Sequence, residues 1–292
     1  DVEPGPDLGM QVVSWTVDAG YTAVERRDEV LHLAQWHRQA GNHAGCRLRF
    51  GPDGHLFVSV GDLRCGTFPQ DLGVLAGKVL RVAVDPHTGV ATAPSDNPFV
   101  GDADPTDDLV FSYGHRNPQG LAWRPGTDQM WSVEHGSNVD DEVNRLVAGA
   151  NRGWSPDGPV ACADGTSDVE EPTPWYDDTR PLTDLARFPQ ALPAQWTSGA
   201  PTIATSGATW LEGESWGGWE GGLLVATLKG RHARVLFFTD TGVFVEHRVP
   251  SELDGTYGRL RTPQLSPGGA VLLTTSNGGG EDRILEVTSS PS

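Results

Sequence analysis

The chain alternates between short apolar runs and turns rich in glycine and proline. Each apolar run, built mainly from Val, Leu, Phe and Trp, follows a shorter strand-like segment across a Gly-containing turn. Turns such as Pro-Asp-Gly and Pro-Gly-Gly favour tight hairpins, and no long segment keeps the 3.6-residue period of a helix. Four hairpins are therefore predicted, over residues 47–62, 120–136, 207–230 and 262–279.

The four predicted hairpins indicate a repeat architecture. They start roughly 55 to 85 residues apart, which leaves room for four-stranded sheets with loops. Further strand-like runs, such as "GKVLRVAVD", lie between them. Radial repetition of such sheets leaves few strand edges open. We therefore predict an all-β fold with a single β-propeller domain over residues 1–292, and a β-sandwich is the structural alternative.

Charge, apolar run length and cysteine spacing exclude several kinds of partner and site. The 39 acidic and 21 basic residues give a formal charge of −18, which argues against nucleic acid and anionic membrane surfaces as partners. No apolar run reaches the ~18 residues of a membrane span. The three cysteines lack the spacing of a zinc site. Cys46 and Cys65 flank the first hairpin and are the favoured disulfide pair.

Polar residues gather at one end of the predicted hairpins. A hairpin's first strand begins at the end where its second strand finishes, so in a propeller these residues share one face around the axis. Four of them are cations, which suits a ligand with several carboxylates or phosphates. His43 could act as a general base, and the acidic run 140–142 could hold a hard cation. The residues at these ends are His43, Asp62, His115, Arg116, Asn117, Glu134, His135, Gly136, Thr202, Lys229, Arg259, Arg261 and Asn277.

Several of these residues fall in motifs of a known family. The chain resembles the soluble quinoprotein glucose and aldose sugar dehydrogenases of the glucose/sorbosone dehydrogenase family, and is most similar to actinobacterial members. The matching segments run in the family's order from about residue 40 to the end of the chain. They are "NHAGCRLRFGPDGHLFVSVGD", "QDLGVLAGKVLRV", "SYGHRNPQGLAW", "EHGSNVDDEVNRLVAGANRGW", "GGLLVATLKG" and "YGRLRT...TTSN...GGEDRILEV".

The resemblance implies a six-bladed propeller that binds pyrroloquinoline quinone (PQQ) and calcium on one face. PQQ is a flat tricarboxylate, which would account for the converging cations. The implied catalytic residues are His43, as the base, and Arg116, beside the quinone. The implied cofactor-binding residues are Arg116, Asn117, Thr202, Lys229, Arg259 and Arg261. The backbone carbonyls of Gly136 and Ser137 would bind the catalytic calcium, and Glu142 would belong to a second calcium site.

The activity implied by the resemblance is PQQ-dependent oxidation of an aldose at its anomeric carbon, which yields a lactone. Hydride would pass to the quinone, and a separate acceptor would then take the electrons. The protein would be extracellular, periplasmic or at the cell surface. Family members carry one to two blades of sequence before "NHAG", so we expect part of these blades to be absent from this chain. Arg152 stands where some members use Tyr to help bind the second calcium.

Two other functions remain open at this stage. A calcium-dependent lactonase of the propeller kind needs a cage of Glu, Asn and Asp side chains on the axis, without a cluster of cations. Arg116, Lys229, Arg259 and Arg261 argue against that function. A non-catalytic propeller relative would act as a binding module, and the retained His43 argues against this second alternative.

Overall fold

β-Strands are the main regular elements of the computed structural model. The structure describes residues 10–33, 42–156, 177 and 179–289. Within these ranges eighteen strands form five sheets, and the helical elements are three short 3-10 turns. No helix in this part of the chain has the length and apolar character needed to span a membrane. The predicted all-β class is therefore confirmed.

The sheets follow one another along the chain, and their paired strands are antiparallel. The first is a ribbon of β1 (Met10–Val17) and β2 (Val24–Leu33). The second contains β3 (Gly45–Phe50), β4 (Leu56–Val60), β5 (Lys78–Val84), β6 (Ala91–Thr92) and β7 (Val110–Tyr113). The third contains β8 (Pro118–Trp123), β9 (Met130–Glu134), β10 (Glu142–Arg145) and β11 (Trp196–Thr197). The fourth contains β12 (Thr205–Trp210), β13 (Leu223–Thr227), β14 (Ala233–Phe238) and β15 (Phe244–Arg248). The fifth contains β16 (Leu260–Leu265), β17 (Val271–Thr275) and β18 (Ile284–Val287).

The 3-10 turns lie in the connections between these strands. They are η1 (Phe68–Gln70), η2 (Glu214–Trp219) and η3 (Ser251–Leu253). η1 joins β4 to β5, η2 joins the two strands of the third predicted hairpin, and η3 joins β15 to β16. All four predicted hairpins are confirmed, as the pairs β3–β4, β8–β9, β12–β13 and β16–β17.

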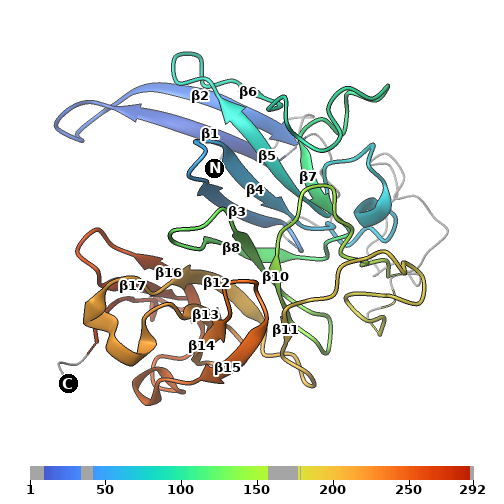
Figure 1. Ribbon diagram of the computed structural model, residues 1–292. Coiled ribbons are helices and arrows are strands. Elements are labelled where there is room, and N and C mark those ends of the chain that lie inside the picture. Colours follow the sequence, from blue (N-terminus) through green and yellow to red (C-terminus); the bar gives the residue numbers. More distant parts are fainter. Residues whose placement is uncertain (1–9, 34–41, 157–176, 178, 290–292) are drawn as a thin grey trace.

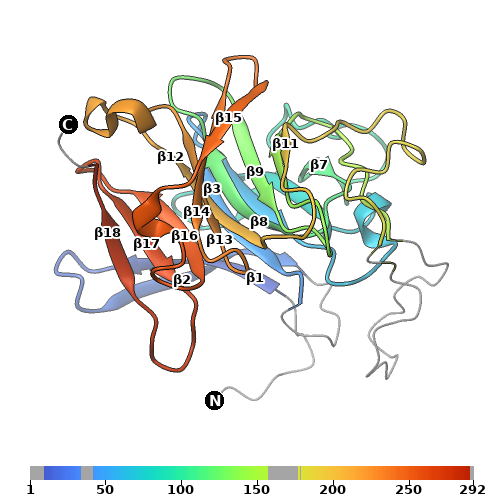
Figure 2. The same cartoon turned by 90° about the horizontal axis from the view of Figure 1, so that it is seen from below.

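The first strands of the four larger sheets lie side by side. β3 contacts β8, β8 contacts β12, and β12 contacts β16, and Figures 1 and 2 show these strands toward the middle of the molecule. A Cβ added at Gly120 of β8 would lie 2.5 Å from the carbonyl oxygen of Ser206, so this approach requires glycine. Successive sheets whose first strands form an inner ring are the arrangement of a β-propeller. The number of six blades stays a prediction.

The second strand of each of the first three hairpins is buried between neighbouring sheets. Every residue of β4, β9 and β13 is buried, which explains why these strands read as nearly continuous apolar runs. In the core between the third and fourth sheets, Trp131 packs against Trp210 and Phe238, with ring centroids 5.5 and 4.5 Å away. Large aromatic side chains bury much apolar area at such contacts, so they hold the two sheets together.

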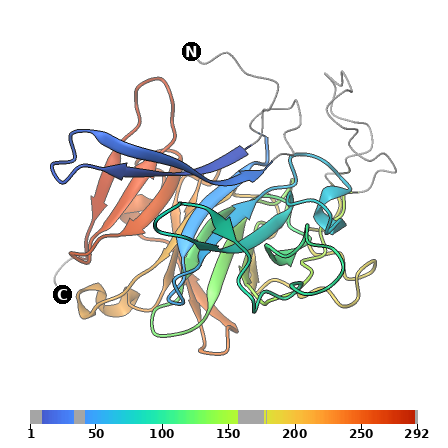
Figure 3. The same cartoon turned by 90° about the horizontal axis from the view of Figure 1, so that it is seen from above.

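The ribbon β1–β2 packs on the second sheet. Val12 and Leu31 of the ribbon share a core with Val58 and Leu80, and the ribbon extends beyond that sheet (Figure 3). The fifth sheet has three strands among the described residues, whereas the third and fourth have four.

The predicted disulfide between Cys46 and Cys65 is wrong. Cys46 is a free, exposed thiol whose Sγ lies 3.3 Å from Met10 Sδ. Cys65 is fully buried and disulfide-bonded. The two cysteines flank the same hairpin, but Cys46 sits inside β3 with a left-handed φ of 66°, and its side chain is directed to the ribbon. Proximity in the sequence was a poor guide to the pairing.

Candidate functional site

His43 and Asp62 meet at the end of the first hairpin. His43 Nδ1 lies 2.8 Å from Asp62 Oδ1, and the Asp62 side chain is fully buried. The second oxygen of Asp62 accepts a hydrogen bond of 2.7 Å from Trp154 Nε1. A buried carboxylate with two such partners holds the imidazole in one orientation. The two ends of the first hairpin, which were predicted to lie together, thus place a histidine beside its carboxylate partner.

The backbone around Asp62 is built for this close approach. A Cβ at Gly61 would lie 1.8 Å from the carbonyl oxygen of His43, so no other residue fits there. His43 itself has a left-handed φ of 52°, a conformation that is uncommon for a residue with a side chain. The Asp62 amide donates to the carbonyl of Arg116 at 2.8 Å. The first hairpin is thus fixed directly to the segment before the second.

His115 is part of the framework behind this site. It is fully buried, with Nδ1 2.9 Å from Glu134 Oε2 and Nε2 2.9 Å from Ser112 Oγ. The other oxygen of Glu134 accepts hydrogen bonds from the backbone amides of Arg116 and Asn117. His115 and Glu134 therefore set the position of the two residues that follow His115.

Arg116 reaches from this framework to the end of the second hairpin. Its Nη1 donates to the carbonyls of His135 and Gly136, both at 3.0 Å. The guanidinium carbon also lies 5.6 Å from the ring centroid of Trp154, within range of a cation–π contact. Because Trp154 also donates to Asp62, it connects the arginine with the His43–Asp62 pair.

Asn117 also links the first two hairpins. Its side-chain oxygen accepts from the amide of Gly45 at 3.2 Å, and its carbonyl accepts from the amide of His135 at 3.1 Å. Burial lowers the pKa of His135 against the opposing charge of Asp141, and Arg116 and His43 make smaller contributions that lower it. His43, Arg116 and His135 are therefore neighbours in one electrostatic environment.

Arginines from two hairpins converge on the inner strands. Arg261 of β16 donates to Gln119 Oε1 of β8 at 2.7 Å, and Arg47 of β3 donates to Thr262 Oγ1 of β16 at 3.0 Å. Burial lowers the pKa of Arg47, and the charges of Arg261 and Arg49 lower it further; burial and the charge of Arg259 lower the pKa of Arg261.

No described carboxylate forms an ion pair with Arg47, Arg259 or Arg261. Positive charges that repel one another next to the axis, in a chain of net charge −18, favour binding of an anion. The cations therefore fit a ligand with several carboxylates. Arg259 and Lys229 are exposed, so their side chains can reach a ligand above the strands.

The carbonyl oxygen of Gly136, an expected calcium ligand, already has partners within the protein. The carbonyl oxygen of Gly136 lies 3.0 Å from Arg116 Nη1 and 2.5 Å from His135 Nδ1, so a cation there would have to replace one of these contacts. Ser137 follows it in the turn after β9. Over the described ranges, no group of three or more His, Cys, Asp and Glu side chains is arranged to hold a metal ion.

Glu142, expected at a second calcium site, is buried beside a cation of the protein. Burial, and next the charge of Glu134, raise the pKa of Glu142 to about 8. Its oxygens accept hydrogen bonds from Thr183 Oγ1 at 2.8 Å and Asn144 Nδ2 at 3.3 Å. Arg152 lies close enough for the charge of Glu142 to raise its pKa, although burial lowers it to about 10 overall. Both oxygens of Glu142 are thus engaged by neighbouring side chains, and a second calcium ion there stays a prediction.

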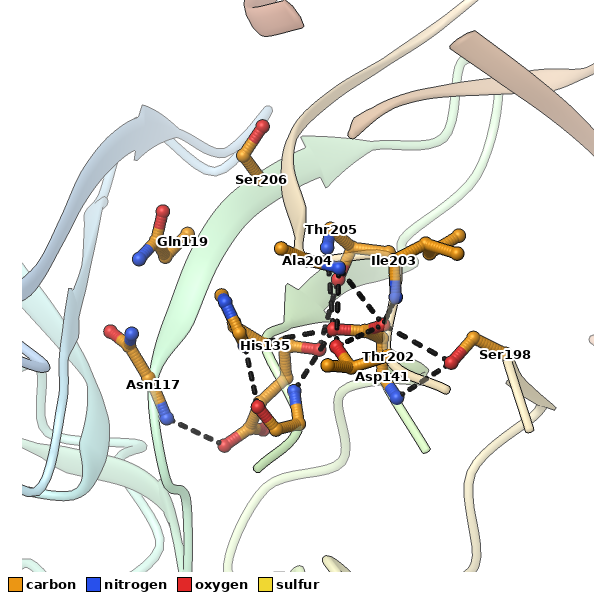
Figure 4. Close-up of polar contacts among 12 residues, drawn as sticks. Asn117, Gln119, His135, Asp141, Ser198, Thr202, Ile203, Ala204, Thr205 and Ser206 are labelled. Atoms are coloured by element: carbon orange, nitrogen blue, oxygen red, sulfur yellow. Dashed lines mark hydrogen bonds and ion pairs between the residues drawn. The ribbon is translucent and has the colours of Figure 1, made fainter. Parts of the chain in front are cut away.

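Thr202, Lys229 and the turn at Gly136 are brought together by a residue that sequence reasoning placed only in an acidic run. Asp141 is fully buried, and its oxygens accept hydrogen bonds rather than facing solvent (Figure 4).

The sequence also predicted no functional role for four other residues: Asp62, Glu134, Trp154 and Arg47. Asp62 and Glu134 both end the second strand of a hairpin, which was the available signal; Trp154 and Asp141 lie in loops and gave none.

The propeller-like succession of sheets, with cations and a histidine–carboxylate pair among its inner strands, suits an anionic ligand. The family model of glucose/sorbosone dehydrogenases matches residues 4–286. The chain therefore belongs to the glucose/sorbosone dehydrogenase family.

Three similar proteins illustrate this membership. An uncharacterised Synechocystis protein, slr1608, is 31% identical over 261 residues, which are 85% of this chain and 57% of that protein. Aldose sugar dehydrogenase YliI of Escherichia coli is 28% identical over 251 residues, 82% of this chain and 59% of that protein. The PQQ-bound aldose sugar dehydrogenase of Streptomyces coelicolor has a similar structure, with a TM-score of 0.68 and 28% identity, over 94% of this chain and 71% of that one. The chain thus spans less than two thirds of the length of these two curated relatives.

Proposed function

We propose that this chain carries the site of a PQQ-dependent sugar dehydrogenase, which oxidises an aldose at its anomeric carbon to the lactone. The observation that carries the proposal is the pairing of His43 with buried Asp62, together with the inner-strand arginines Arg47, Arg259 and Arg261, which form no ion pair with a described carboxylate. A base and a tricarboxylate-binding surface at the same end of the inner strands match the two requirements of this chemistry. Similarity to the PQQ-bound Streptomyces coelicolor enzyme supports it.

In this proposal the quinone is held by charge and by hydrogen bonds. Arg259, Arg261 and Lys229 would pair with its carboxylates, since ionised donors make the strongest hydrogen bonds to such groups. Asn117 and Thr202 would line its edge. When bound, the quinone supplies the acceptor for the hydride of the anomeric carbon.

His43 would take the proton of the anomeric hydroxyl. Asp62 accepts at Nδ1, so the neutral ring presents Nε2 as its basic nitrogen, and the buried carboxylate would stabilise the imidazolium that forms. The guanidinium of Arg116, fixed by two carbonyls and by Trp154, would stabilise negative charge that develops near it. His43 would therefore take up the proton, and Arg116 would stabilise the negative charge that develops in the same reaction.

The carbonyls of Gly136 and Ser137 are the proposed ligands of a catalytic calcium. An ion at Gly136 would compete with Arg116 Nη1 for the carbonyl oxygen. A second ion, at Glu142, would need that side chain in its ionised form.

The remaining features of the whole protein are part of the same proposal. Residues 1–292 would belong to one six-bladed propeller domain, and a separate acceptor would take the electrons. An extracellular, periplasmic or cell-surface location is supported by the disulfide at Cys65, because such bonds persist in oxidising compartments.

Reconstitution tests the proposal. The apo-protein would be mixed with PQQ and calcium, and dye reduction would be followed with glucose and other aldoses. We expect sugar-dependent reduction that requires PQQ. Absence of quinone binding at micromolar concentration would refute the proposal for this chain, and binding without turnover would favour a binding module. Lactone hydrolysis without PQQ would favour the lactonase.

A further inference from the structure

One buried carboxylate connects three loops that carry predicted cofactor contacts. Asp141 has no exposed surface and follows the turn at Gly136. Its Oδ1 accepts from the amides of Gly136 at 3.1 Å and Thr205 at 3.3 Å. Its Oδ2 accepts from the amides of Ile203 at 2.7 Å and Ala204 at 3.2 Å. Figure 4 shows the carboxylate at the centre of these contacts.

Two hydroxyl groups and the His135 ring, whose Nδ1 lies 3.7 Å from Oδ1, also lie beside the Asp141 carboxylate. Thr202 Oγ1 lies 2.7 Å and Ser198 Oγ 3.1 Å from Oδ2. The backbone adds three further hydrogen bonds between the two loops: Asp140 N to the Gly199 carbonyl, Ser198 N to the Asp141 carbonyl and Thr202 N to the Asn138 carbonyl, each at 2.9 Å. Residues 198–205 and the turn 136–141 therefore form one unit.

The same segment holds the loop that carries Lys229. The carbonyl of Ile203 accepts from the amides of Lys229 at 3.1 Å and Gly230 at 2.8 Å, and the carbonyl of Ala204 accepts from the amide of Leu228 at 2.9 Å. Ile203 and Ala204 therefore each donate a backbone amide hydrogen bond to Asp141. Their carbonyls accept hydrogen bonds from the amides of residues 228–230. A displacement of Ile203 would be passed directly to Lys229.

We propose that Asp141 is a positioning residue for the cofactor site, which sets the placement of Thr202, Lys229 and the Gly136 carbonyl without touching the ligand. This proposal rests on the proposed function, because those three groups are its predicted cofactor contacts. A carboxylate is suited to the task, since its two oxygens accept from several N–H and O–H donors at once. An asparagine offers only one acceptor oxygen and turns an NH2 group toward donors.

The test compares the wild-type chain with Asp141→Asn. The matched control is Asp184→Asn, which removes the charge of another buried carboxylate that accepts from two amides, those of Ala186 and Arg187, both at 3.1 Å. Amide hydrogen exchange of the apo-protein is the first measurement. In Asp141→Asn we expect Ile203, Ala204, Lys229 and Gly230 to exchange about tenfold faster or more, with the β3–β5 amides unchanged.

Quinone affinity is the second measurement. We expect the Kd for PQQ, at constant calcium, to rise about 10–100-fold in Asp141→Asn, as for supporting residues of other ligand sites, while kcat at saturating PQQ changes much less. The Asp184→Asn control should keep the wild-type Kd. An unchanged Kd in Asp141→Asn would overturn the proposal, whatever the exchange rates.

Failure of the wild type to bind PQQ and failure of Asp141→Asn to fold can each be distinguished from failure of this proposal. If the wild-type chain binds no PQQ, the proposed function fails, and exchange alone decides whether Asp141 holds the segments of Ile203 and Lys229; unchanged exchange would then overturn that role. If Asp141→Asn does not fold, Ser198→Ala removes one contact to the same carboxylate. It should accelerate exchange at Ile203 and Ala204, and wild-type exchange there would count against the proposal.

Discussion

His43 Nδ1 lies 2.8 Å from the carboxylate of Asp62, whose other oxygen is bound by the indole of Trp154 at 2.7 Å. Asp62 is therefore held from two directions and has no freedom to leave the imidazole. The pair joins the two ends of the first hairpin, and Trp154 brings in a loop more than ninety positions later in the chain. This arrangement gives His43 a defined orientation and a defined basic nitrogen.

Asp62→Asn should reduce turnover strongly while the quinone still binds. The amide cannot stabilise the imidazolium and favours the wrong ring tautomer, so we expect kcat to fall by about 100-fold or more. Steady-state dye reduction at saturating PQQ measures the effect. The Kd for PQQ should stay within about threefold of wild type; a wild-type kcat would contradict the role of Asp62.

Arg261→Ala should weaken quinone binding. Removing one charge-assisted contact should raise the Kd for PQQ about 10–100-fold, with a smaller effect at high salt. Fluorescence titration of the apo-protein measures this. Arg283→Ala is the control, because Arg283 is an exposed arginine just before β18 of the same sheet. Equal effects of the two substitutions would point to net charge instead of a specific contact.

Glu142→Gln should remove a pH dependence of stability. Burial raises the pKa of Glu142 from 4.5 to about 8, so the folded protein holds a proton that the unfolded chain releases. The stabilisation from this group is complete below about pH 4.5, declines as pH rises, and is lost once pH passes about 8. Thermal unfolding between these pH values should show wild type losing stability relative to Glu142→Gln. A constant difference would contradict the raised pKa.

The two described cysteines should differ in their effect on stability. Cys65→Ser breaks a disulfide and should cost about 2–4 kcal/mol in the free energy of unfolding. Cys46→Ser, at a free and exposed thiol, should cost less than about 1 kcal/mol. Denaturant unfolding under oxidising conditions compares them. A loss for Cys46→Ser as large as that for Cys65→Ser would instead support the pairing expected from the sequence.

The hairpins could be predicted because their signals are local. A Pro-Asp-Gly or Pro-Gly-Gly turn between two apolar runs specifies a hairpin without reference to the rest of the chain. The end-of-strand argument placed His43 near Asp62, because hairpin pairing alone brings residues 43 and 62 together. The apolar strands β4 and β9 were recognisable for the same reason.

The supporting residues could not be predicted because their roles depend on long-range packing. His115, which precedes Arg116 in the motif, turned out to be a buried partner of Glu134. Asp141 is one of three consecutive acidic residues, and nothing in that run distinguishes this carboxylate, which accepts backbone amides, from Glu142, whose pKa is raised by burial. The partner of Cys65 likewise depends on how distant loops meet.

The most direct measurement is the reduction of bound PQQ in a single turnover without an external acceptor. The wild-type chain and His43→Ala would each be loaded with PQQ and calcium, mixed anaerobically with an aldose, and followed by the absorbance of the quinone. We expect both proteins to bind PQQ with similar affinity, and only the wild type to reduce it. Equal reduction in both proteins, or no reduction in wild type by any aldose, would contradict the proposed sugar dehydrogenase site.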